Sequence, residues 1–184
     1  FPYTTLFRSR DYSWIPNDAD PASNNDAFDA NVSDETSASF PNARFGRYMF
    51  ETQTPDDTFT ATKYRNMYYG IREAGIFMEN VDRCPELNAE QKTEYKAEAR
   101  FLRAYYYFYI MKNYGPTFFN GDTSYESLDK DVNVVDRTAW QPLVDWVCNE
   151  LDAAAADLPD LRDASSGLGR ATKGAALAIK ARLL

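Results

Sequence analysis

The sequence contains no histidine among its 184 residues. Histidine is the side chain that most often serves as a general base, and it is the commonest metal ligand in proteins. Its absence excludes a Ser–His–Asp triad and a Cys–His pair. A catalytic interpretation of this chain would have to use other groups, of which paired carboxylates are one candidate.

Cysteine is also scarce. The chain has two cysteines, Cys84 and Cys148, which is too few for a disulfide framework. Cys148 shares an apolar helical stripe with Val144, Val147 and Leu151. This pattern predicts a buried and unreactive thiol.

Positively charged residues are outnumbered, and long apolar runs are missing. Lys and Arg number 20 against 28 Asp and Glu, which gives a net charge of −8. Phosphate binding needs clustered Lys and Arg, so we expect no nucleic-acid partner and no docking onto anionic lipids through a basic patch. No run reaches the ~18–20 apolar residues of a membrane-spanning helix.

Both ends of the chain have unusual sequences. Residues 2–9 read PYTTLFRS, which looks like the translation of a sequencing adapter. We therefore expect residues 1–9 to be a non-native leader. The last residues, Ala181 to Leu184, fall inside a helical pattern without a stop signal, and we expect the natural protein to continue beyond them.

Tyr and Phe are abundant, with 13 Tyr and 12 Phe in the chain. Residues 10–57 combine isolated aromatics with clusters of Asn, Asp, Ser and Pro, which is typical of loops. The remainder, residues 58–184, contains helical periodicity. We expect a loop-rich N-terminal segment followed by a helical scaffold.

Apolar spacings of three and four residues predict four helices in this scaffold, interrupted by a second polar loop at residues 117–136. Asn88 and Gln91 form a capping box for the second helix, and Gly115-Pro116 ends it. Thr138 and Gln141 form a similar pair for the third helix. The predicted ranges are 58–82, 89–114, 139–158 and 171 to the end of the chain.

These helices carry halves of the tetratricopeptide pattern. Trp140-x-x-Leu143 matches its first helix, and Ala97-x-x-x-Phe101-x-x-Ala104 matches its second. Small residues let two helices approach closely while a large ring fills the gap between them. The sequence thus predicts an all-α fold of tetratricopeptide-like helical hairpins, two pairs with the second truncated, joined by long irregular loops.

Four motifs follow one another along the scaffold. They are Tyr64-x-x-x-Tyr68-x-x-Ile71-Arg72, the run KAEARFLRAYYY from Lys96 to Tyr107, Asp152 to Pro159, and GRATKGAA from Gly169 to Ala176. In this order they resemble the SusD-like (RagB/SusD) family of nutrient-binding proteins, over residues 58–184.

The resemblance implies a lipid-anchored protein on the surface of the outer membrane of Bacteroidetes-type bacteria. Such proteins bind oligosaccharides or other nutrients without catalysis and cap a SusC-like TonB-dependent transporter. Membrane association would come only through a lipid anchor, which we expect to lie outside this sequence. We also expect the loop-rich C-terminal half of the family, which supplies part of the ligand site, to lie outside it.

Ligand candidates are flat rings in polar surroundings, because sugars stack their C–H faces on aromatic rings while polar side chains bind the hydroxyls. The expected stacking residues are Trp14, Phe45, Tyr48 and Phe59. The expected polar partners are Asp34, Asn42 and Arg44.

Other clusters favour structural roles. We expect the aromatic run from Phe101 to Tyr109 to be core, because it shows core periodicity. Arg100 and Arg103, with Glu98, are read as a structural ion-pair network. The carboxylates at positions 90, 94 and 98 are read as a solvated helix face and not as a catalytic pair. Asp and Asn residues at positions 18–26 lack the pattern of a calcium loop.

Two hypotheses remain from different classes. The first is a non-enzymatic, cofactor-free glycan-binding protein, and the second is a tetratricopeptide-like scaffold that binds only other proteins. Measured sugar binding separates them.

Overall fold

A computed structural model describes residues 54, 58–119, 121, 136–163 and 167–184 of the chain, with side chains described from Tyr64 onward within its first helix. The chain forms two compact units, whose boundary falls between Asn66 and Met67. The unit that begins at Met67 holds nearly all of the described structure, including most of the first helix and every later one.

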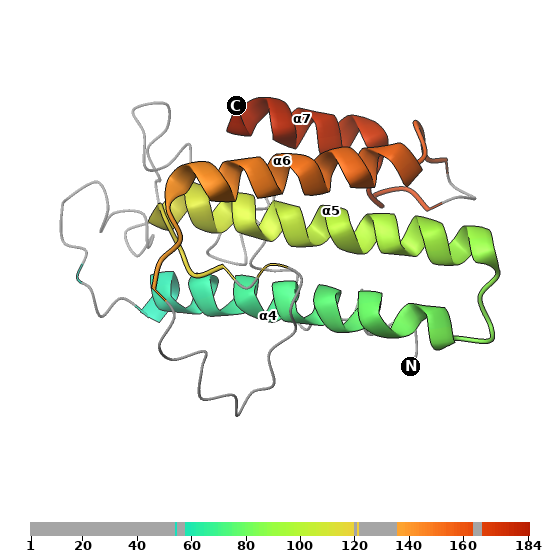
Figure 1. Cartoon of the computed structure of the whole chain (residues 1–184), viewed down its shortest axis with the longest axis horizontal. Helices are drawn as coiled ribbons and strands as arrows, with labels where there is room; N and C mark the ends of the chain where they lie inside the picture. The colour runs from blue at the N-terminus through green and yellow to red at the C-terminus, as the bar shows by residue number, and fades with distance from the viewer. Residues whose placement is uncertain (1–53, 55–57, 120, 122–135, 164–166) are drawn as a thin grey trace, which may run out of the picture. The chain divides into compact units, whose positions relative to one another are not determined.

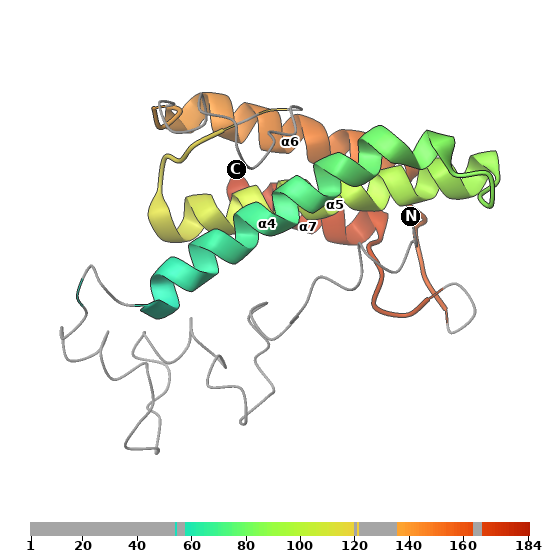
Figure 2. The ribbon, with the colours of Figure 1, turned by 90° about the horizontal axis from the view of Figure 1, so that it is seen from below.

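Every regular element in the described residues is helical (Figure 1). The elements are α4 (Thr58–Asn80), the short 3-10 helix η2 (Val81–Arg83), α5 (Ala89–Tyr114), α6 (Trp140–Asp157) and α7 (Lys173–Leu183). From Met67 on, successive long helices run in opposite directions, and α4 is inclined to α5 (Figures 1 and 2).

Helix α5 has the bounds that the sequence predicts, because both of its ends are fixed by local interactions. The Asn88 side chain accepts a hydrogen bond from the Gln91 backbone N–H at 2.8 Å, and the Gln91 side chain accepts one from the Asn88 N–H at 3.0 Å. At the other end Gly115 adopts φ of 70°, where a glycine is favoured, and its N–H closes the last turn on Met111. The predicted capping box is confirmed.

The predicted capping box of the third helix is wrong. Ala139 is the N-cap of α6, and no side chain caps this end. The Thr138 backbone N–H donates instead to the Thr117 carbonyl at 2.9 Å, and Gln141 donates to the Asp145 carboxylate. Thr117 lies far from Thr138 along the chain, so no local sequence pattern predicts this contact.

Helix α7 begins two residues later than predicted. The Thr172 hydroxyl accepts a hydrogen bond from the Ala175 N–H at 3.2 Å, which makes Thr172 the N-cap and Lys173 the first helical residue. The helix before η2 also ends slightly early, at Asn80, because the chain tightens into the 3-10 turn.

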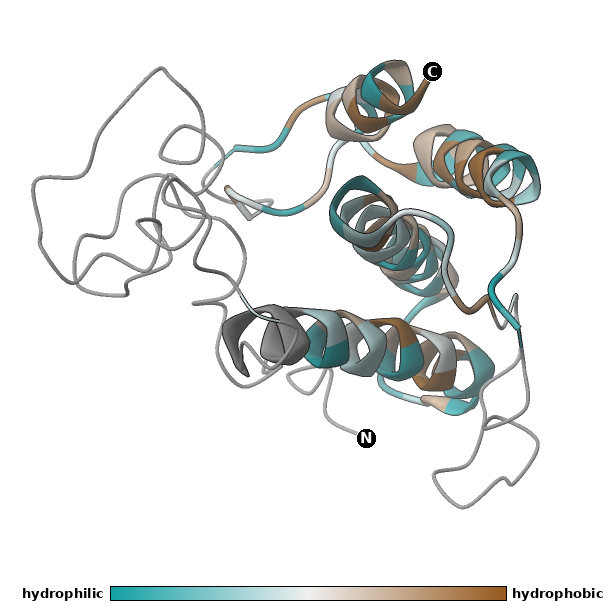
Figure 3. Cartoon of the chain, turned by 90° about the vertical axis from the view of Figure 1, so that its left-hand side faces the viewer, coloured by the Kyte–Doolittle hydropathy of each residue, from teal (hydrophilic) through white to brown (hydrophobic). Residues whose placement is uncertain are grey.

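The core of this unit lies between α4, α5 and α6, and α7 packs on α6 (Figure 3). Its largest fully buried side chains are Tyr107, Met67, Ile110, Met111, Leu143, Leu151 and Val147. Small residues allow close helix contact, since Ala97 and Ala104 are both buried. Gly70 of α4 lies directly against the ring of Tyr106 on α5.

One large ring of the predicted repeat pattern does not enter the core. Trp140 is 43% exposed, although Leu143 is fully buried as the pattern requires. Trp146 takes the interior position, in edge contact with the rings of Tyr107 and Phe119 at 5.2 and 4.9 Å. The tryptophan that matches the motif is therefore not the one that packs against α5.

The aromatic run on α5 belongs to the core only in part. Phe101, Tyr105 and Tyr109 are half-buried and contact one another along one side of the helix. Tyr106, Tyr107 and Phe108 are buried, and burial raises the pKa of the neighbouring Tyr105 hydroxyl. Cys148 is a buried free thiol, as predicted, and burial raises its pKa. None of the described helices has the length and apolar character needed to cross a membrane.

Candidate functional site

The seven ligand residues expected from the sequence lie outside the described side chains. Trp14, Asp34, Asn42, Arg44, Phe45 and Tyr48 all fall within residues 1–53. Phe59 falls in the first turn of α4, where only the helical backbone is described. The Asp and Asn residues at positions 18–26 also lie outside. The expected ligand site thus stays a prediction.

The described unit holds both ends of the segment between Thr117 and Thr138. The Tyr68 hydroxyl of α4 donates to the Phe118 carbonyl at 2.6 Å and shares a hydrogen bond with the buried Thr117 hydroxyl at 2.7 Å. The Thr117 carbonyl in turn accepts from Thr138. The two ends of the segment 118–137 are therefore fixed side by side.

An aromatic cluster supports this junction from the helical side. Tyr107 of α5 makes edge contacts with Phe119 and Trp146, with ring centroids 5.5 and 5.2 Å apart. The Arg103 guanidinium lies 5.0 Å from the centre of the Trp146 ring. A cation over an indole face adds electrostatic attraction to the packing. These contacts attach Phe119, next to the junction, to α5 and α6.

Buried charges join α5 to α6. Arg103 donates to the Glu150 carboxylate at 2.7 Å, and Arg100 donates to its other oxygen at 3.3 Å. Arg103 and Glu150 are both buried. The predicted structural ion-pair role of these arginines is confirmed, but their partner is Glu150 and not Glu98. Sequence patterns do not mark Glu150 as the partner, because it lies about 50 residues away on another helix.

A second charged cluster joins α5 to the segment between α6 and α7. Arg162 pairs with Glu94 and Glu98, at 2.5 Å to the latter, and its side chain is 4% exposed. Arg170 reaches Glu98 at 2.8 Å and lies 5.0 Å from the Tyr95 ring centre. The expectation that this helix face is solvated is wrong for Glu98, because the chain after Pro159 folds back over it. Glu94 is half-buried, and Glu90 is exposed as expected.

Glu98 is the most enclosed acid of this cluster, at 2% exposure. Burial raises the pKa of its carboxyl, and the two arginines oppose that shift. Its Oε1 atom accepts a hydrogen bond from Arg162 and forms an ion pair with Arg170, while its buried Oε2 has no hydrogen-bond partner within the described part of the chain. Arg162, which no sequence motif marks, is the residue that pairs with both Glu94 and Glu98.

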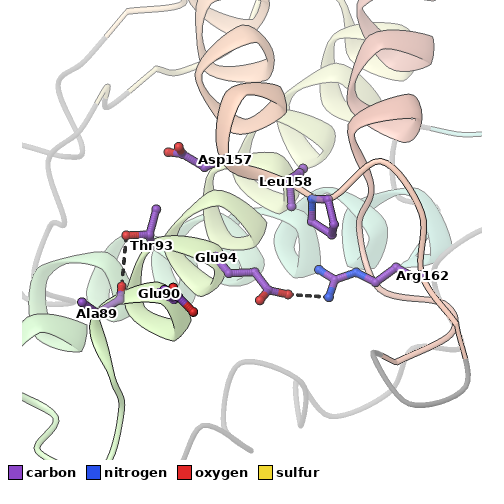
Figure 4. Close-up of a pocket in the computed structure, with 8 residues that line it drawn as sticks. Ala89, Glu90, Thr93, Glu94, Asp157, Leu158 and Arg162 are labelled. Atoms are coloured by element: carbon purple, nitrogen blue, oxygen red, sulfur yellow. Dashed lines mark hydrogen bonds and ion pairs between the residues drawn. The ribbon is translucent and has the colours of Figure 1, made fainter.

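A shallow groove of about 550 Å³ opens beside the cluster (Figure 4). It lies where the first turns of α5 meet the end of α6. Figure 4 shows the Arg162 and Glu94 side chains pointing toward each other, whereas Asp157 points away from them. The lining residues are Ala89, Glu90, Thr93, Glu94, Asp157, Leu158, Pro159 and Arg162.

The chemistry available in the groove is limited. Glu94 is engaged in an ion pair with the Arg162 guanidinium. Within the described residues no group of Cys, Asp and Glu has an arrangement that would hold a metal ion. The groove and its charged cluster read as structural support between α5 and the turn that follows α6.

Comparisons with known proteins place the chain in a family. Residues 12–184 match the profile of a SusD-like family that is described as starch-binding and associating with the outer membrane. The match covers more than half of the sequence, so the chain belongs to this SusD-like family. A SusD-like protein of Formosa agariphila is 26% identical over 120 residues, which are 65% of this chain and 22% of that protein.

Solved structures of SusD-like proteins also match this chain. A SusD-like protein of Bacteroides fragilis matches with a TM-score of 0.65 and 26% identity over 77% of this chain and 26% of its own. A SusD-like carbohydrate-binding protein of the same species has a TM-score of 0.62 and 32% identity over 71% of this chain and 25% of its own. The predicted tetratricopeptide-like, all-α fold class is confirmed. The chain spans about a quarter of the length of these relatives.

Proposed function

We propose that this chain is the helical scaffold of a surface protein that binds oligosaccharides or related nutrients without chemically altering them. The observation that carries the proposal is the match of residues 12–184 to a family described as starch-binding. The 32% identical relative from Bacteroides fragilis is described as carbohydrate-binding, which supports the same substrate class.

The proposed ligand surface uses rings that stack on sugar faces and polar groups that bind hydroxyls. The stacking residues are Trp14, Phe45, Tyr48 and Phe59, and the polar partners are Asp34, Asn42 and Arg44. Six of these residues precede α4 in the sequence, and Phe59 lies in its first turn. Rings that are held in place before the sugar arrives would lose little further conformational freedom on binding.

We further propose that the full-length protein is anchored by a lipid on the outer face of the outer membrane and hands its ligand to a SusC-like TonB-dependent transporter. The family's described association with the outer membrane supports the location. The transporter partner follows from the motif resemblance. Co-purification of the full-length protein with such a transporter from detergent-solubilised membranes tests this part.

Calorimetric titration of the full-length protein with a panel of oligosaccharides tests ligand binding. We expect Trp14→Ala and Phe45→Ala each to weaken binding by about tenfold or more, since each removes a stacking ring. Tyr69→Ala is the matched control, because Tyr69 is an aromatic residue on α4 that is 59% exposed and not in the candidate set.

Four outcomes separate the hypotheses. Sugar binding that depends on Trp14 and Phe45 supports the proposal. Sugar binding that these variants leave unchanged keeps the function but refutes the proposed residues. No binding to any sugar, together with a stable protein partner, favours the scaffold hypothesis. Release of reducing ends from a bound oligosaccharide would contradict a non-catalytic role.

A further inference from the structure

The segment between α6 and α7 separates its charged side chains by sign. Arg162 and Arg170 turn inward and pair with acids of α5, so that their side chains are only 4% and 22% exposed. Asp160 and Asp163 stay exposed, although Asp160 lies 3.8 Å from the Lys173 ammonium. Folding thus leaves acids among the most exposed charges of a segment whose sequence has no excess of acids.

The end of α6 adds negative charge beside the same segment. Asp157 is the last residue of α6, and the last turn of this helix contains no basic residue. An acid at this end is unfavourable, because the last carbonyls of a helix already carry partial negative charge. Asp157 is exposed, makes no ion pair among the described residues, and points away from the Arg162–Glu94 pair (Figure 4). A residue that breaks a local rule without compensation is a candidate for function.

The groove beside Asp157 excludes most kinds of ligand. No aromatic ring is found among its described lining residues, so it offers nothing for a sugar face to stack on. The exposed acids Glu90 and Asp157 repel phosphate groups, and no metal-binding group of acids and thiols occurs in the described part of the chain. Ala89, Leu158 and Pro159 give it apolar walls. Cationic and apolar side chains together match this lining.

We propose that the groove between the first turns of α5 and the end of α6 is a docking surface for a short basic and apolar segment of another protein. Glu90 and Asp157 would bind its cations, and the apolar walls would take its hydrophobic side chains. Leu161, between the lining residues Pro159 and Arg162 in the sequence, is 86% exposed and offers further apolar area. The ion pairs of Arg162 support one wall of the groove, which agrees with their structural role.

Fluorescence anisotropy with the full-length protein tests the proposal. The probe is a fluorescein-labelled peptide of alternating lysine and leucine, and a glutamate–leucine peptide of the same length is its control. We expect the lysine peptide to bind at least about tenfold more tightly than the glutamate peptide, and added salt to weaken its binding. None of the proposed sugar contacts lies in the groove, so this result is independent of sugar binding.

Two matched substitutions separate the groove from the general negative charge of the protein. Asp157→Lys reverses the charge at the groove, and Asp145→Lys makes the same change at an exposed position about 18 Å away along α6. We expect Asp157→Lys to weaken binding of the lysine peptide by about fivefold or more, and Asp145→Lys by less than about twofold. Asp157→Lys should not lower the melting temperature, because a lysine at this end of a helix is favourable.

A third variant blocks the groove without changing its charge. Thr93 is an exposed lining residue of α5, and Thr93→Trp should weaken binding of the lysine peptide as much as Asp157→Lys does. Equal affinity for the two peptides, equal effects of Asp157→Lys and Asp145→Lys, or binding that Thr93→Trp leaves unchanged would each refute the proposal. Dimerisation of the full-length protein that Thr93→Trp abolishes would also refute it, since the occupant would then be a second copy.

Discussion

Arg103 of α5 donates a hydrogen bond to Glu150 of α6 at 2.7 Å, and both side chains are buried. The pair joins two helices that are 47 residues apart at these positions. It also lies beside the ring of Trp146, which the Arg103 guanidinium approaches to 5.0 Å. The stability of the helical unit should depend strongly on buried contacts of this kind.

Glu150→Gln should destabilise the chain by about 3–5 kcal/mol, because it removes the buried carboxylate charge that Arg103 and Arg100 share between α5 and α6. Urea unfolding followed by circular dichroism measures the loss. Glu79→Gln is the control, since Glu79 is exposed on α4, and it should change the free energy of unfolding by less than about 0.5 kcal/mol. Similar losses in the two variants would show that the buried pair has no special role.

Gly70→Ala should also destabilise the chain, by about 1–3 kcal/mol. A β-carbon at position 70 would stand 2.4 Å from the Tyr106 ring, so α4 and α5 would have to move apart. Helix propensity alone predicts the opposite, a gain of about 1 kcal/mol. Gly174→Ala is the control, because the nearest atom to a β-carbon there is 3.9 Å away. Stabilisation by both substitutions would contradict the close contact.

Asn88→Ala should cost about 1 kcal/mol, because it removes the side chain that caps α5. Thr138→Ala should cost less than about 0.5 kcal/mol, since Thr138 uses its backbone and not its side chain in front of α6. Thermal unfolding of the two variants compares them directly. A larger loss of stability for Thr138→Ala than for Asn88→Ala would show that the Thr138 side chain caps α6, as the sequence predicts.

Arg162→Ala should release the segment between α6 and α7 and cost about 3 kcal/mol, because it leaves Glu98 buried with one guanidinium fewer. Amide exchange in residues 159–172 should become faster than in the wild type. Arg83→Ala, at an exposed position of η2, is the control. Unchanged exchange in that segment would mean that other contacts hold it in place.

The Asp82–Lys96 pair gives a prediction about pH. The Lys96 ammonium donates to the Asp82 carboxylate at 2.7 Å and lowers the pKa of that carboxyl. A pKa that is lower in the folded than in the unfolded chain stabilises the fold above the unfolded value, and this contribution is lost as the pH falls through the folded value, below about pH 4.

An NMR titration of Asp82 checks this directly. Lys96→Met should move the Asp82 pKa upward, toward the ordinary value for aspartate, and added salt should produce a smaller shift in the same direction. Lys112→Met is the control, because Lys112 lies over the Tyr109 ring near the other end of α5. An Asp82 pKa that is identical in all three proteins would rule out the pair as the cause.

The helices of this protein follow from short stretches of its sequence. The sequence predicts a helix over residues 89–114, and α5 has these bounds, because Asn88, Gln91 and Gly115 fix its ends through contacts within four residues. The burial of the run from Tyr106 to Phe108 and of Cys148 also follows from local periodicity. The family can be inferred for the same reason, since its motifs are continuous segments.

Partners across the chain are decided only by the folded structure. Local pattern makes Glu94 and Glu98 a solvated face, Thr138 a cap and Trp140 the interior ring. The structure instead places Arg162 on the two acids, Thr117 against Thr138, and Trp146 against Tyr107. Each of these contacts joins residues that are distant in the sequence. Their geometry depends on how the helices pack, and no periodicity or capping rule within one helix contains that information.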